Sequence, residues 1–285
     1  MMVNRISQLS QGAILGAAVI VAAVIMPVRL LAQEEGKSMP ETQAPAAPQP
    51  APQPANPAKP APPRTGGYWT KHDQQLLVDF GDLAHFKDAD AALGPPAAGE
   101  DRVVFLGDSI TQAWRLDDSF PGKLYVNRGI SGETSPQILV RFRQDVVDLQ
   151  AKVVVILAGT NDVAGNTGPM TPEQTEDNLA SMADLATANG IRVVLCSVLP
   201  SVDFWWNPGQ EPAPKIRALN DWIRAYAARK GYVYVDYYSA MKDARGGLPP
   251  NLSRDGVHPL PAGYAVMTPL AEAGIEAALR RDRKH

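Results

Sequence analysis

The sequence predicts an α/β fold in which the strands of a parallel sheet are joined by crossover helices. From residue 68 onward, short apolar runs alternate with segments of helical periodicity. The runs contain almost no polar residues, which is typical of strands buried on both faces of a sheet. The composition agrees, because 45% hydrophobic and 20% charged residues among 285 suit a globular core and exclude a polytopic membrane protein.

Residues 1–35 have the features of an export segment that is not part of the fold. Arg5 supplies a positive start, and residues 13–28 form an uncharged apolar run shorter than the ~20 residues of a comfortable membrane span. We expect a cleaved signal peptide, with an uncleaved N-terminal membrane anchor as the alternative. The expected location is therefore the periplasm or the extracellular space. The only cysteine, Cys196, lies far downstream, which excludes lipoprotein anchoring.

Residues 36–66 are rich in proline and alanine and are predicted to be an extended linker. Residues 67–285 are then the predicted folded domain. A single cysteine excludes an intramolecular disulfide framework and a cysteine-based zinc site. The formal net charge of −3 gives no general attraction to nucleic acid.

The predicted strands are five short apolar runs. They cover residues 103–106, 123–127, 153–157, 193–198 and 232–235. Cys196 lies inside the fourth run, so we expect it to be a buried apolar residue and not a nucleophile.

Two of the helices between these strands have clear boundaries. The first begins with a capping box at Thr171-Pro-Glu-Gln174 and ends at Gly190. The second carries apolar residues at steps of three and four and ends before Gly231. Trp222 lies on the apolar face of this second helix, so we predict that it belongs to the core.

Four small polar segments interrupt this pattern. GDSIT at 107–111, NRGISG at 127–132 and GTND at 159–162 each follow a predicted strand, and DGVHP at 255–259 lies near the C-terminus. Open α/β sheets bind their ligands at the carboxyl ends of their strands. We therefore expect these segments to form the functional site.

Histidine is the usual general base near neutral pH, and the chain has four. His285 is the last residue, and surface positions are expected for His72 and His85, which precede the sheet. His258 remains as the candidate. Asp255 lies three residues before it, close enough in a turn for its carboxylate to orient the imidazole. The alternative is a motif that only stabilises the turn.

Ser109 is the candidate nucleophile because a sharp turn after Gly107 would expose its hydroxyl above the sheet. Thr111 stands where a G-x-S-x-G elbow has its second glycine, so the large α/β-hydrolase fold is not supported. The backbone amides of Ser109 and Gly132 and the side-chain amide of Asn161 are candidate oxyanion donors. Alternatively, Gly132 is an ordinary turn glycine and Asn161 a loop cap.

Together, in this order, the four segments resemble the blocks of the SGNH hydrolases, the GDSL-type esterase and lipase family. The resemblance extends over roughly residues 103–265 and, within the family, is greatest to secreted bacterial acylhydrolases. It implies a three-layer α/β/α flavodoxin-like sandwich with a five-stranded, mostly parallel sheet, and it implies no metal and no cofactor.

The resemblance also implies a triad of Ser109, His258 and Asp255. The oxyanion hole it implies is formed by Ser109, Gly132 and Asn161. Because the second block contains two glycines, Gly129 is the alternative to Gly132.

We therefore predict a serine ester hydrolase that removes short acyl groups, acetyl in the first place, from an extracellular glycan or a small ester. Trp114, Trp205 and Trp206 are candidate substrate contacts, with simple packing as the alternative. The rival functions are an O-acyltransferase acting on glycan and a catalytically inactive glycan-binding module. A phosphate-handling loop is disfavoured because residues 107–111 contain no lysine. No nucleic-acid partner is expected, and a membrane is expected only through an uncleaved N-terminal segment.

Overall fold

The computed structural model describes residues 74–280. The predicted export segment at 1–35, the predicted linker at 36–66, His72 and His285 lie outside the described residues. Within 74–280, no helix combines the length and the apolar character that a membrane crossing requires.

The sheet has five parallel strands in the order β2-β1-β3-β4-β5, which confirms the predicted α/β fold. The strands are β1 (Val103–Gly107), β2 (Val126–Gly129), β3 (Val153–Leu157), β4 (Arg192–Cys196) and β5 (Val233–Val235). This order is that of the flavodoxin-like folds. In these folds the chain first adds β2 on one side of β1 and then continues on the other side with β3, so the strand order reverses between β1 and β3. The register pairs Gly107 with both Gly129 and Leu157, so β1, β2 and β3 end level with one another.

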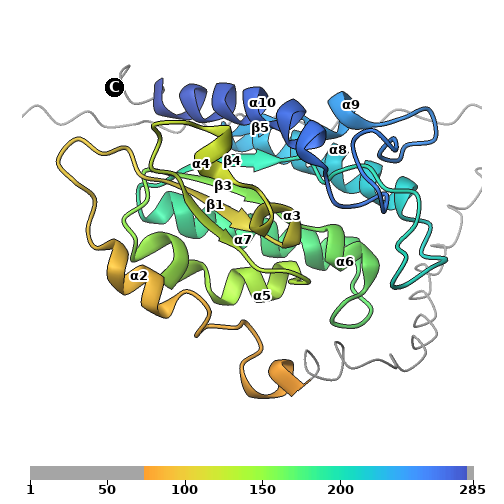
Figure 1. Cartoon of the computed structure of the whole chain (residues 1–285). Helices are drawn as coiled ribbons and strands as arrows, with labels where there is room; N and C mark the ends of the chain where they lie inside the picture. The colour runs from red at the N-terminus through yellow and green to blue at the C-terminus, as the bar shows by residue number, and fades with distance from the viewer. Residues whose placement is uncertain (1–73, 281–285) are drawn as a thin grey trace, which may run out of the picture. The chain divides into compact units, whose positions relative to one another are not determined.

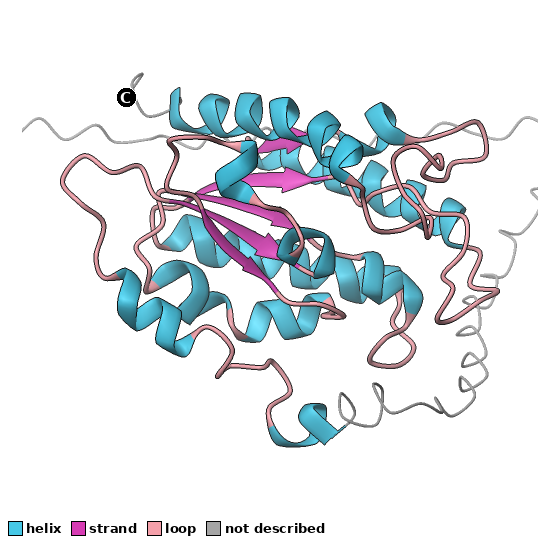
Figure 2. Ribbon diagram, viewed as in Figure 1, coloured by secondary structure: helices cyan, strands magenta, loops and turns pink. Residues whose placement is uncertain are grey.

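Helices cover both faces of the sheet and give three layers (Figures 1 and 2). The helical elements are α2 (Lys87–Leu93), α3 (Ser109–Gln112), α4 (Leu116–Ser119), α5 (Ser135–Val140), the π-helix η1 (Arg143–Val147), α6 (Thr160–Ala164), α7 (Pro172–Ala188), α8 (Pro212–Lys230), α9 (Tyr237–Met241) and α10 (Pro261–Arg280). One face packs against α5, η1, α7 and α8, and the other packs against α9 and α10.

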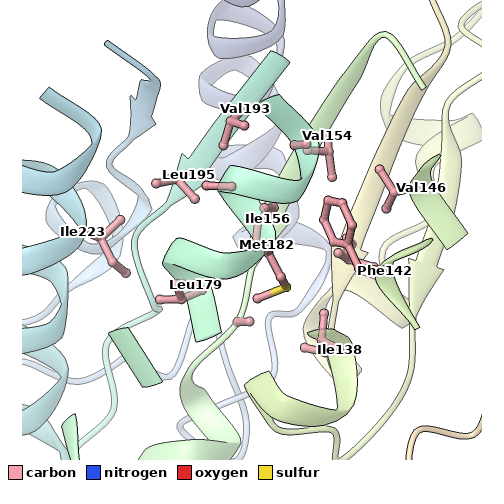
Figure 3. Close-up of a cluster of buried hydrophobic side chains, with 14 of the residues drawn as sticks. Ile138, Phe142, Val146, Val154, Ile156, Leu179, Met182, Val193, Leu195 and Ile223 are labelled. Carbon is pink, nitrogen blue, oxygen red and sulfur yellow. The ribbon is translucent and has the colours of Figure 1, made fainter. Parts of the chain in front are cut away.

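Alternation along each strand divides the core into two clusters. Val154 and Ile156 of β3 point to the layer of α7, where they meet Met182 (Figure 3). Val153 and Val155 of the same strand point to the layer of α10. Side chains of a buried parallel strand contact apolar partners on both sides, which explains why the run at 153–157 has no polar residue.

The two helices with predicted boundaries are confirmed. Thr171 Oγ1 accepts a hydrogen bond from the Gln174 amide at 3.3 Å, and Gln174 Oε1 accepts one from the Thr171 amide at 2.9 Å. In α8, Trp222 packs on the core and stacks on Tyr226, with ring centroids 4.8 Å apart. Cys196 is buried as predicted, and burial, only partly opposed by the neighbouring Tyr237 side chain, raises the pKa of its thiol to about 12.

Candidate functional site

The site begins at the carboxyl end of β1. Asp108 caps α3 by accepting a hydrogen bond from the Ile110 amide at 2.9 Å, and Ser109 is the first residue of the helix. A Cβ atom on Gly107 would lie 2.3 Å from Thr111 Oγ1 and 2.4 Å from the carbonyl oxygen of Leu157. Only glycine therefore allows the tight turn that presents the Ser109 hydroxyl at the sheet edge.

The structure brings Ser109, His258 and Asp255 into one line of hydrogen bonds. Ser109 Oγ lies 2.9 Å from His258 Nε2, and His258 Nδ1 lies 2.7 Å from Asp255 Oδ2. The other carboxylate oxygen of Asp255 accepts from the amides of His258 and Val257 at 2.8 and 3.0 Å, and from Ser253 Oγ at 3.1 Å. Two amides and a hydroxyl thus hold Asp255 Oδ1 in place, and Asp255 Oδ2 is the oxygen that orients the imidazole.

The same contacts set the charge of Asp255. Partial burial on its own would raise the pKa of this carboxyl, but hydrogen bonds from the His258 side chain and from the amides of His258 and Val257 outweigh that effect. The pKa of Asp255 is lowered to about 2. The carboxylate is therefore ionised at neutral pH and can accept a hydrogen bond from His258 Nδ1.

The candidate oxyanion donors come from three strand ends. Asn161, in α6 after β3, is buried, and its Nδ2 donates to the carbonyl oxygen of Glu133 at 2.9 Å. Gly132, after β2, has φ of +82°, a left-handed conformation that favours glycine. Ser109, Gly132 and Asn161 follow β1, β2 and β3 respectively. They therefore lie near the point where the strand order reverses, which is where flavodoxin-like sheets bind ligands.

Gly129 differs from Gly132 in its surroundings. Gly129 lies within β2, and its amide donates to Asn127 Oδ1 at 2.9 Å. A Cβ atom there would lie 2.2 Å from the backbone nitrogen of Gln112, so this glycine permits the close approach of β2 to α3. The amide of Gly129 is already used in the fold, which favours Gly132 as the donor.

Asn166 is a site residue that the sequence analysis missed. Its Nδ2 donates to Asn161 Oδ1 at 2.8 Å and to the Gly132 carbonyl oxygen at 3.0 Å, and its Oδ1 accepts from Trp206 Nε1 at 2.9 Å. Asn166 follows GTND by four residues, and no chemical signal in the sequence distinguishes it from other loop asparagines.

The three candidate tryptophans occupy different environments. Trp205 is 66% exposed, and Trp206 is half-buried with its ring centroid 6.4 Å from that of His258. Trp114 is only 3% exposed, packs against Phe105 and Tyr264, and donates its Nε1 hydrogen to Ser119 Oγ. The expectation that Trp114 contacts substrate is therefore corrected: its indole is a core side chain with its polar atom satisfied internally.

Buried acids surround the site. Burial raises the pKa of Asp108 to about 7, against the opposing hydrogen bond from the Ile110 amide and the attraction of a charged His258. Burial also raises the pKa of Asp162, which accepts hydrogen bonds from the amide and hydroxyl of Ser135.

Among residues 74–280, His, Cys, Asp and Glu form no group of three or more that could hold a metal ion.

Residues 105–266 match the GDSL-like lipase/acylhydrolase family. The chain belongs to this family. Family membership makes it a GDSL-type carboxylic ester hydrolase. The match runs from β1 into α10 and so includes every residue of the site described above.

Named relatives agree with the family. Esterase TesA of Pseudomonas aeruginosa is 33% identical over 56% of this chain and 77% of its own length. An acetylxylan esterase of Geobacillus stearothermophilus is 25% identical over 62% of this chain and 95% of its own. The crystal structure of a GDSL-like lipase from Bacteroides thetaiotaomicron is 45% identical and superimposes with a TM-score of 0.68, covering 70% of this chain and 100% of that one.

Proposed function

We propose that the chain hydrolyses short acyl esters, acetyl esters in the first place, through an acyl-enzyme formed on Ser109. The observation that carries this proposal is the line of hydrogen bonds from Ser109 Oγ through the His258 imidazole to the Asp255 carboxylate. The candidate nucleophile, base and orienting acid each lie at hydrogen-bond distance from the next, as a serine acyl-transfer mechanism requires.

In the first half-reaction, Ser109 Oγ attacks the ester carbonyl carbon while its proton passes to His258 Nε2. Asp255 stabilises the resulting imidazolium through Nδ1. The amides of Ser109 and Gly132 and the Asn161 side chain donate to the oxyanion of the tetrahedral intermediate. The C–O bond to the alcohol then breaks, the proton on Nε2 moves to the departing oxygen, and the acyl group remains on Ser109.

Water completes the reaction. His258 Nε2 takes a proton from the water molecule as its oxygen attacks the acyl carbon, and a second tetrahedral intermediate forms in the same oxyanion hole. When it collapses, the bond to Ser109 Oγ breaks, and the proton on Nε2 returns to that oxygen. The acid leaves and Ser109 regains its hydroxyl.

The proposed substrate is an extracellular glycan acetate or a comparable small ester. One relative is named for acetylxylan, and an exposed indole at Trp205 next to the site offers an apolar face on which a sugar ring can stack. The apolar run at residues 13–28 supports export of the enzyme to meet such a substrate.

The test is hydrolysis of p-nitrophenyl esters from acetate to octanoate by the full chain, beside Ser109→Ala at equal concentration. We expect highest kcat/KM for acetate, labelling of wild type by a fluorophosphonate probe, and loss of both in the folded variant. Acylated product on an added glycan acceptor would instead indicate a transferase. A folded wild-type chain without hydrolysis or labelling would contradict the proposal.

A further inference from the structure

Asn166 lies at the centre of a buried network behind the proposed oxyanion hole. It is 5% exposed, and its side chain joins three segments: the Asn161 side chain, the carbonyl group of Gly132, and the Trp206 indole. Its backbone amide also donates to the Asn161 carbonyl oxygen at 3.0 Å. The two asparagines are thereby held together through both backbone and side chain.

The partners fix which end of the Asn166 amide points where. An indole nitrogen only donates, so the atom facing Trp206 must be Oδ1. A backbone carbonyl only accepts, so the atom facing Gly132 must be Nδ2. Two independent partners therefore require the same orientation, and a flipped side chain would lose both hydrogen bonds.

This orientation determines that of Asn161. Because Asn166 presents Nδ2 to it at 2.8 Å, Asn161 must present its acceptor Oδ1 in return. Asn161 Nδ2 is then turned away: it donates to the Glu133 carbonyl oxygen at 2.9 Å and makes a longer contact of 3.4 Å to Asp108 Oδ2, and the hydrogen of this longer contact is the proposed oxyanion donor. If Asn161 flipped, a carbonyl oxygen would face the developing negative charge and repel it.

We propose that Asn166 is a positioning residue that holds the Asn161 amide in its donating orientation, and that Trp206 fixes Asn166. The inference rests on the proposed function and adds residues outside the four motif segments. The inference also gives Trp206 two roles. Its Nε1 supports the oxyanion hole through Asn166, and its ring lies next to His258, the proposed base. Preorganised donors of this kind lower the barrier without reorganising during the reaction.

The decisive variant is Asn166→Asp, which keeps the shape and the acceptor for Trp206 but removes both donated hydrogen bonds. The new carboxylate would face Asn161 Oδ1 and repel it, so we expect it to push the Asn161 amide out of its donating orientation. We expect kcat for p-nitrophenyl acetate to fall by about 10²-fold or more with KM within about twofold, as for Asn161→Ala. In a double-mutant cycle, Asn166→Asp should lower kcat little further when Asn161 is already alanine.

Asn220→Asp is the matched control. Asn220 is 3% exposed and bonds the backbone of Val198 through both ends of its amide, accepting from the nitrogen at 2.7 Å and donating to the oxygen at 3.0 Å. The same chemical change there places a carboxylate beside a carbonyl group, as at Asn166. We expect lower stability for this variant and an unchanged kcat.

Trp206→Phe provides a second test if Asn166→Asp does not fold. It removes the indole donor and keeps an aromatic ring, and we expect a smaller fall in kcat that disappears in the Asn161→Ala background. Fully additive effects in either cycle, or an equal loss of kcat in Asn220→Asp, would overturn the positioning role. Activity retained by Ser109→Ala would instead refute the proposed function, so the two failures are distinguishable.

Discussion

Arg141 donates from Nη2 to the carbonyl oxygen of Gly107 at 2.9 Å, two residues before Ser109. Its Nη1 donates to the carbonyl oxygen of Arg128, also at 2.9 Å. A completely buried guanidinium thus joins the ends of β1 and β2, the strands that lead to Ser109 and Gly132. Its charge is balanced by Glu133 and Asp145, each with a carboxylate oxygen 2.6 Å away.

Replacing Arg141 by methionine should destabilise the domain strongly. The substitution leaves two buried carbonyl groups without their donor and two acids without their counter-charge, and breaking a buried pair in this way typically costs about 3–5 kcal/mol. Urea unfolding at pH 7 measures the difference. Glu133→Gln is the comparison, because it keeps an acceptor oxygen for Arg141 and leaves Asp145 as the counter-charge, so a smaller loss is expected. A loss below about 1 kcal/mol in Arg141→Met would contradict this prediction.

Asp108 should make stability fall as pH rises from about 4 to 7. Burial raises its pKa from the usual 3.8 to about 7. A carboxyl with a higher pKa in the folded protein contributes its full stabilisation below 3.8 and loses it as pH rises through 7, by up to about 4 kcal/mol. Asp108→Asn keeps the acceptor for the Ile110 amide and removes the titration, so its decline should be shallower. Unfolding free energies at pH 5 and 8 measure this, and equal declines in the two proteins would refute it.

The fold could be predicted where burial alone determines the residue type. The run at 153–157 coincides with β3 because a strand covered on both faces must be apolar throughout. The run at 123–127 was placed too early, since β2 spans Val126–Gly129 and Leu124 is 79% exposed. Arg128 pairs with Leu106 in the sheet, and its buried guanidinium is matched by Asp90 of α2, a partner 38 residues away that no local pattern reveals.

The site residues divide in the same way, into those that a local motif indicates and those that only contacts between distant segments reveal. Ser109, Gly132, Asn161 and His258 were identifiable from local motifs, and the structure brings their four segments together. Arg141 and Asn166 were not identifiable, because each acts through hydrogen bonds to distant segments and neither residue type is unusual in a helix or a loop. Trp114 was misassigned because an indole suits a pocket and a core equally well, and only its packing decides between them.

Trp205→Ala should separate glycan esters from small esters. The indole is 66% exposed, so its removal should change the unfolding free energy by less than about 0.5 kcal/mol. If a sugar ring stacks on it, KM for acetylated xylo-oligosaccharides should rise several-fold while kcat/KM for p-nitrophenyl acetate stays unchanged. Leu124→Ala is a matched control, because Leu124 is also a largely exposed apolar side chain, on the approach to β2. Unchanged KM for the oligosaccharides would exclude Trp205 as a glycan contact.

Asp255→Asn should lower kcat by about 10³–10⁴-fold, because the amide cannot stabilise the imidazolium and favours the wrong tautomer of His258.

In the wild type, hydrogen bonds from His258 and Val257 overcome the effect of burial and lower the pKa of Asp255 to about 2. A carboxyl with a lowered pKa stabilises the fold above its usual value of 3.8, and this contribution disappears only as pH falls toward 2. Asp255 therefore stays ionised from pH 4 to 9. Asp255 should therefore add no step of its own to the kcat/KM profile above pH 4. More than a tenth of wild-type kcat in Asp255→Asn would show that the carboxylate does not have this role.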